Sequence, residues 1–136
     1  MDLDAARAVL AEQHHAVLAT LRADGTPQMS PVLAALDDQG RVVVSTRESA
    51  VKVRNLRRTP RAWLCVLPDD FFGRWIQVGG RVRIVQLPEA MEGLVDHYRR
   101  ISGEHPNWDE YRAAMQRERR VLLQIELTSA GPDQAG

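Results

Sequence analysis

Apolar runs recur along much of the chain, and a run of about four to eight apolar residues bounded by turn residues is typical of a β-strand. The apolar runs are short, and turn signals such as Asp24-Gly25 separate them. This pattern predicts six strands, the first three of which are joined by tight turns. The predicted strands span residues 16–21, 27–36, 41–46, 61–67, 74–86 and 121–127.

Two positions predict irregularities within these strands. Pro31 has no N–H to donate to a neighbouring strand, so it indicates an edge or a bulge in the second strand. Gly79-Gly80 indicates a bulge or bend in the long fifth strand, because glycine weakens a strand interior and often marks such a site.

Four other segments carry helical signals. Ser49 is expected to cap the second helix, which ends at Thr59 because the residue before Pro60 avoids the helical region. Asn107 is expected to cap the fourth helix. The predicted helices span residues 2–13, 50–59, 87–101 and 108–118.

The number of strands decides the expected fold class, which is mainly β. A small six-stranded β-barrel with peripheral helices is predicted, because closure removes exposed sheet edges. A chain of 136 residues suits one domain, so residues 1–136 are expected to form a single domain with a single core. Residues 128–136 read as a frayed tail, with 130–136 flexible.

Composition bears on the cellular location of the protein and on its thiol and metal chemistry. No apolar run approaches the roughly 20 residues of a membrane span, and the N-terminus is not signal-like, so a cytoplasmic protein with no membrane partner is expected. Cys65 is the sole cysteine and lies in an apolar run, which favours a buried, inert thiol. No histidine has metal-ligand spacing, so no metal site is predicted.

Charge concentrates in one segment although the net charge is zero. Residues 47–61 hold six basic residues against Glu48 alone, and Lys52, the sole lysine of the chain, lies among them. Such a segment indicates a local anion site more than a nucleic-acid surface, and a solvated basic helix face is the simpler alternative.

The start of the second helix is the candidate binding site. Ser45 and Thr46 offer hydroxyl groups, the helix offers free N–H groups, and Lys52 and Arg54 add cationic donors, which together suit a phosphate. The chain contains no P-loop, no GxGxxG fingerprint and no nucleophile motif. No catalytic residue is therefore assigned, and a bound cofactor is expected to supply the chemistry.

The segments AVLATLRADGTPQMSPV, VVVST, KVRNLRRTPRA and GEHPNWDEYRAAM together resemble the pyridoxamine 5′-phosphate oxidase-like family of FMN-binding split barrels. The last segment is similar to the branch of this family that uses the deazaflavin coenzyme F420. The resemblance implies a homodimer of six-stranded split barrels with a flavin or deazaflavin in each of two clefts between the subunits. It also implies an oxidoreductase that transfers hydride between the cofactor and a small unsaturated organic substrate.

The resemblance also implies roles for individual residues. Lys52 would contact the cofactor phosphate beside Ser45 and Thr46, and Arg54 and Arg57 would lie at the anionic end of the cleft. Around the ring system, Gln28 and Ser30 would border the cofactor, and Trp75 would approach from the partner subunit. Packing is the simpler explanation for Trp75.

One departure from the family pattern bears on the cofactor. Pyridoxamine phosphate oxidases carry Ser-Arg-Lys at the phosphate site, whereas this chain reads Ala50-Val51-Lys52. The missing arginine disfavours FMN, and the surplus of arginines on the helix suits the longer anionic tail of F420. The alternatives are an FMN-dependent oxidase or reductase of the same fold and a non-catalytic carrier of flavin, haem or an apolar ligand.

Overall fold

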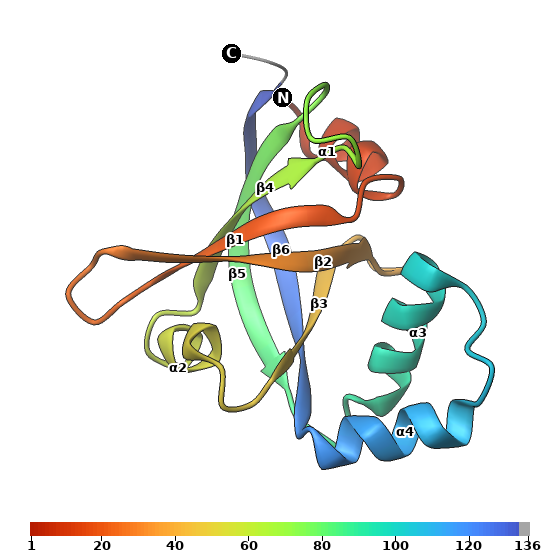
Figure 1. Cartoon of the computed structure of the whole chain (residues 1–136). Helices are drawn as coiled ribbons and strands as arrows, with labels where there is room; N and C mark the ends of the chain where they lie inside the picture. The colour runs from red at the N-terminus through yellow and green to blue at the C-terminus, as the bar shows by residue number, and fades with distance from the viewer. Residues whose placement is uncertain (134–136) are drawn as a thin grey trace.

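Six antiparallel strands close into a barrel, and four helices lie around it (Figure 1). The computed structural model describes residues 1–133. Within this range, no helix is long and apolar enough to cross a membrane. The strands are β1 His15–Leu21, β2 Pro27–Leu36, β3 Val42–Arg47, β4 Arg61–Leu67, β5 Ile76–Val85 and β6 Arg120–Asp133. The helices are α1 Leu3–Leu10, α2 Val51–Arg58, α3 Met91–Ser102 and α4 Trp108–Arg117.

The barrel closes in the order β1-β2-β3-β6-β5-β4, which confirms the predicted fold class. Pairing between β2 and β3 is limited to Ala34–Leu36 against Val42–Val44. Before Ala34, β2 pairs with β1 alone, and after Val44, β3 pairs with β6 alone. The barrel is therefore split between β2 and β3, and Pro31 lies on the open edge, as its missing N–H predicts.

The predicted irregularity in β5 is also present. The register between β5 and β6 shifts between Gly79 and Gly80. A Cβ atom on Gly80 would overlap the backbone carbonyl of Glu126, so the close approach of the two strands requires glycine at this position.

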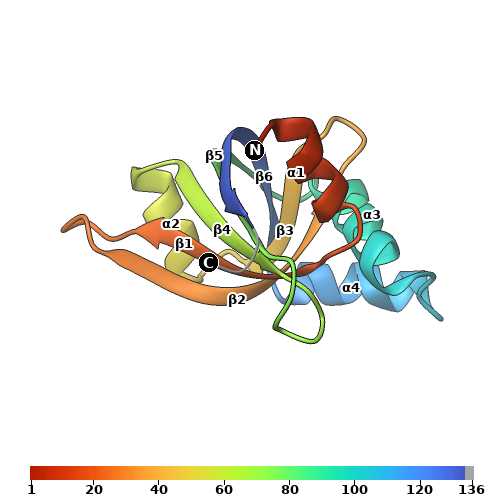
Figure 2. The same ribbon diagram turned by 90° about the horizontal axis from the view of Figure 1, so that it is seen from above.

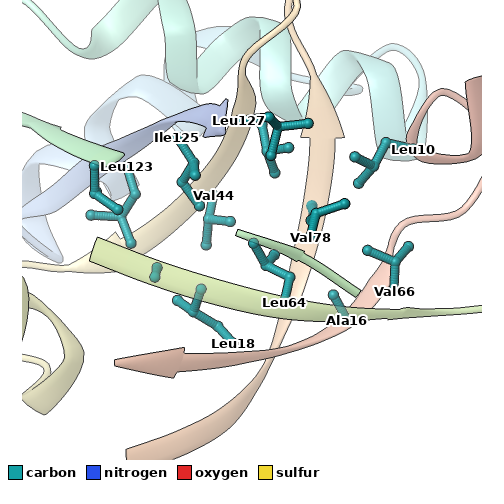
Figure 3. Packing of buried hydrophobic residues seen from close by; sticks show 14 of the residues in the cluster. Leu10, Ala16, Leu18, Val44, Leu64, Val66, Val78, Leu123, Ile125 and Leu127 are labelled. Atoms are coloured by element: carbon teal, nitrogen blue, oxygen red, sulfur yellow. The ribbon is translucent and has the colours of Figure 1, made fainter. Parts of the chain in front are cut away.

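Inward-facing side chains of all six strands fill the barrel with one apolar cluster (Figure 3). Leu18, Leu64 and Leu123 are each at most 1% exposed, and they point toward one another in the interior. Helices α1 and α2 lie near opposite ends of the barrel (Figure 1) and add Leu10 and Leu56 to the same cluster.

A second apolar cluster lies outside the barrel, so the expectation of a single core is wrong. Helices α3 and α4 pack against the outer face of β2, β3 and β6, where they bury Ala35, Val43 and Leu122. Figure 2 shows both helices on one side of the barrel. These strands are apolar on both faces at this point because one face meets the barrel interior and the other meets the helices.

The structure corrects three predicted boundaries. Residues 128–133 were expected to fray, but strand β6 continues to Asp133. It does so because Ala130 pairs with Val78 of β5 and Asp133 pairs with Ile76. Residues 134–136 of the expected tail lie outside the described residues. Ala50, not Ser49, is the N-cap of α2, and α3 begins at Met91 after a turn.

We expect Gly80→Ala to lower the free energy of unfolding by about 1–3 kcal/mol, because the added methyl group has no space at the bulge. Chemical denaturation measures this loss. Arg81→Ala is the matched control on the same strand, because Arg81 is exposed. Equal stability of Gly80→Ala and the control would contradict the tight packing of β5 against β6.

Candidate functional site

A cavity of about 750 Å³ lies at the split of the barrel. It lies where β2 and β3 diverge, and residues of β1, β4, β6, α2, α3 and α4 complete its wall. Its strand side chains include Val17, Pro31, Leu33, Ser45, Thr46 and Arg120, and its remaining lining includes Lys52, His97, Tyr98, Tyr111, Met115 and Glu118. Ordinary binding sites for small molecules and cofactors have this size and this mixture of apolar and polar groups.

Lys52 is a partly buried cation in the first turn of α2. Burial lowers the pKa of Lys52, and the positive charge of Arg120 lowers that pKa further. Within residues 1–133, no carboxylate lies within ion-pair distance of the Lys52 ammonium, and it donates no hydrogen bond to a side chain or backbone carbonyl. A desolvated cation without an anionic partner is typical of a site that binds an anion.

Arg120, the other cation of the cavity, is neutralised within the protein. Oε1 of Glu118 accepts hydrogen bonds from Arg120 at 2.8 and 3.0 Å, and Nη2 of Arg47 lies 3.4 Å from the same oxygen. The Arg120 hydrogen bond holds the pKa of Glu118 below its ordinary value. Among residues 1–133, Lys52 is therefore the cation of the cavity that has no carboxylate partner.

His97 fills the position that β3 leaves open beside β2. Its Nε2 donates to the carbonyl oxygen of Leu33 at 3.0 Å, and Leu33 lies on the part of β2 that has no β3 partner. The ring is only 7% exposed, and burial lowers the pKa of His97. A neutral imidazole therefore satisfies the backbone at the edge of the cavity.

Aromatic rings form the wall opposite the strands. The Tyr111 hydroxyl donates to the carbonyl oxygen of Leu94 at 2.8 Å, and burial raises the pKa of Tyr111 to about 12. The Tyr98 ring packs with its centroid 5.1 Å from the rings of both Tyr111 and His105. Rings held in this way can contact a flat ligand with little loss of side-chain entropy.

The structure brings together three of the predicted site residues, Ser45, Thr46 and Lys52, on the wall of one cavity. The other five predicted residues do not line it. Arg54 and Arg57 lie exposed on α2, and Arg57 pairs with Glu48 at 3.6 Å.

Gln28 and Ser30 lie on β2 away from this lining. Oε1 of Gln28 accepts a hydrogen bond from Thr20, and the Ser30 hydroxyl is buried without a partner among the described residues. Trp75 is partly buried just before β5, and its contact with a cofactor bound to a partner subunit stays a prediction.

Comparison with known proteins decides the family. The model of the pyridoxamine 5′-phosphate oxidase family matches residues 3–130. The chain belongs to this family. The F420H2-dependent biliverdin reductase of Mycobacterium tuberculosis is 28% identical to this family member over 125 residues, which are 91% of this chain and 82% of the relative.

Solved structures share the fold of this pyridoxamine 5′-phosphate oxidase family member. A crystal structure of a conserved hypothetical protein of Mycobacterium tuberculosis aligns with a TM-score of 0.77 and 24% identity over 96% of this chain and 82% of the other. An F420 reductase aligns with a TM-score of 0.71 and 24% identity over 92% and 94% of the two chains. At this identity, the likeness establishes the split-barrel fold.

His97 gives the site a testable pH dependence. Because burial lowers its pKa below the ordinary 6.5, the folded state favours the neutral ring. The stability it contributes is present above pH 6.5 and is lost as the pH falls through the lower pKa of the folded state. We therefore expect His97→Gln, which keeps a donor for Leu33, to flatten the decline of unfolding free energy in this range. Parallel declines in denaturation series of the two proteins would contradict a buried, neutral His97.

Proposed function

We propose that this protein is an F420-dependent oxidoreductase, in which reduced deazaflavin passes a hydride to a small unsaturated organic substrate. The observation that carries the proposal is the partly buried ammonium of Lys52, which lacks an anionic partner within residues 1–133 and lines the cavity at the split of the barrel. A cofactor phosphate is the anion that membership of this flavin-binding family makes the best candidate.

The residues around Lys52 suit a phosphate group. Ser45 and Thr46 add hydroxyl donors on the neighbouring strand, and no side chain caps the first turn of α2. The helix N–H groups that lack partners would add donors to an anion, as helix N-termini commonly do. These residues would hold the phosphate, and Lys52 would supply the charge-assisted hydrogen bond.

Two observations favour F420 over FMN as the cofactor. Val51 stands where pyridoxamine phosphate oxidases carry a phosphate-binding arginine, so one FMN contact is missing. Arg54 is exposed on the same helix without a carboxylate partner among the described residues, and it would bind the negatively charged tail that F420 carries. The curated relative named as F420H2-dependent supports the same cofactor. An FMN-dependent enzyme of the same fold is the alternative.

When bound, the deazaflavin would supply the hydride, and this chain would supply binding and orientation. Tyr98 and Tyr111 offer flat apolar surface for a conjugated substrate, and Met115 and Leu33 add apolar lining to the same cavity. Orientation by such contacts lowers the barrier because the reacting groups lose their freedom before the reaction. We place this activity in the cytoplasm, in keeping with the sequence.

We expect Lys52→Gln to weaken F420 binding by about 1–3 kcal/mol, because a charged hydrogen bond to phosphate is lost. Tryptophan fluorescence during titration measures the dissociation constant, and thermal unfolding shows that the fold is intact. Arg117→Gln is the matched control, because it removes one positive charge from an exposed site outside the cavity. Unchanged affinity in Lys52→Gln would overturn the assignment of Lys52.

The outer face of β1, β2 and β4 supports the further proposal of a homodimer. Outward-facing Val17 pairs with Pro31 on one side and with Cys65 on the other, so the three strands present one apolar strip. Cys65, expected to be buried, is partly exposed on this strip. On β2, Met29 is 63% exposed and Leu33 is 45% exposed. A second copy of the chain would cover this strip and complete the cleft beside Pro31 and Leu33.

We expect Met29→Glu to shift the protein toward a monomer, because a buried interface would then contain an unpaired charge. Analytical ultracentrifugation measures the change in mass, and the same sample titrated with F420 shows the loss of cofactor binding. Ala23→Glu, in the adjoining exposed turn, is the control because it adds the same single negative charge. A wild-type monomer that binds F420 fully would contradict a cleft shared by two subunits.

A further inference from the structure

A chain of polar side chains joins α2 to the hairpin of β1 and β2. Nδ2 of Asn55 donates a hydrogen bond to the hydroxyl oxygen of Thr20 at 3.1 Å. The same Thr20 hydroxyl donates to Oε1 of Gln28 at 3.5 Å. Asn55 is 3% exposed and Thr20 is fully buried. Nη2 of Arg58 donates to Oδ1 of Asn55 and to the carbonyl oxygen of Leu21, each at 3.1 Å. Both ends of the Asn55 amide are thus engaged.

Helix α2 needs contacts of this kind to hold its place. It has eight residues, no side-chain cap and no acidic residue in its first turn. Lys52 and Arg54 place positive charge near the helix N-terminus, where the helix dipole is also positive. Arg57 and Arg58 in the last turn favour the dipole at the other end. An isolated helix of this length is marginal in water. Contacts with the barrel must therefore keep α2 folded and in place.

Two kinds of contact do so, and they differ in what they fix. Val53 and Leu56 are each 1% exposed and belong to the barrel cluster, which holds the helix against the barrel. Apolar contacts have little directional preference, whereas hydrogen bonds require a defined angle and distance. Asn55 follows Lys52 by three residues, so its hydrogen bonds fix the rotation of the turn that carries Lys52.

We propose that Asn55, held by Thr20, is a positioning residue that directs the Lys52 ammonium into the cavity. The inference rests on the proposed role of Lys52 as the phosphate ligand. Gln28 then supports the cofactor site through Thr20 and Asn55. The apolar residues of α2 maintain the fold, and the polar chain maintains the geometry of the anion site.

Thr20→Val and Thr20→Ser form a matched pair that tests this role. Valine has the shape of threonine but no hydroxyl, so the Asn55 amide loses its acceptor, whereas serine keeps the hydroxyl. The double variant Asn55→Leu with Thr20→Val replaces both polar partners by apolar groups, which should keep stability near that of the wild type. The double variant therefore separates a change in the position of Lys52 from a loss of protein stability.

The side-chain amine of Lys52 reports its own position, because the chain has one lysine and labelled lysine gives one side-chain NMR signal. Burial and Arg120 lower its pKa in the wild type. We expect the pKa to rise toward the ordinary value in Thr20→Val and in the double variant, and to stay at the wild-type value in Thr20→Ser. Titration with F420 and with FMN should show affinity about fivefold weaker in the first two proteins.

Each outcome has a definite meaning. A wild-type pKa of Lys52 in both Thr20→Val and the double variant would overturn the proposal, even if F420 binds. If the double variant does not fold, equal Lys52 pKa values in Thr20→Val and Thr20→Ser overturn it. If the wild type binds neither cofactor, the proposed function fails, and the Lys52 titration still decides whether Asn55 sets the position of the ammonium. Leu127→Val, a buried position in the middle of β6, controls for general loss of packing in the barrel core.

Discussion

Pairing between β2 and β3 stops at Ala34 and Val44, and the candidate site occupies the space that this break creates. Each strand keeps its other neighbour beyond that point, so the barrel stays intact while two strand edges separate. Pro31 prevents one further hydrogen bond on the β2 edge, and His97 satisfies the carbonyl of Leu33. Specific groups thus occupy the separated edge of β2, and the cavity lies beside that edge.

The second constraint is electrostatic. The cavity contains two cations, but Glu118 neutralises Arg120 and no carboxylate approaches Lys52 within the described part of the chain. Removing an ammonium from water without a partner is costly, so an anion that binds there regains part of that cost. The N-terminus of helix α2 also favours an anion, because the helix dipole and Lys52 are both positive there. Binding and local stability should therefore be coupled at this helix.

Sequence patterns predicted much of this structure because strands, turns and short helices depend mainly on residues that are near one another in the chain. Short apolar runs bounded by turn signals located the six strands, and Gly79-Gly80 located the bulge. The segment with Ser45, Thr46 and Lys52 was predicted as one site because a strand leads directly into a short helix. The polar residues of 128–133 looked like a tail, yet they form a strand because β5 offers a partner, which only the tertiary structure reveals.

The aromatic wall of the cavity had no comparable signal in the sequence. Tyr98 and Tyr111 lie on two helices at apolar spacing, and periodicity alone does not tell whether such a face meets a core or a cavity. His97 carries no metal-ligand spacing or other signal in the sequence, and its role depends on a carbonyl group 64 residues away in the chain. Long-range packing of α3 and α4 on the outer face of the barrel decides all three positions.

Side-by-side titration of cofactor-free protein with F420 and FMN tests the central claim most directly. Quenching of tryptophan fluorescence reports binding, because the chain has three tryptophans. We expect F420 to bind more tightly than FMN. Tighter binding of FMN would contradict the choice of cofactor and favour the FMN-dependent alternative. Binding of neither would contradict the assignment of the cavity as a flavin site and favour a carrier of another ligand.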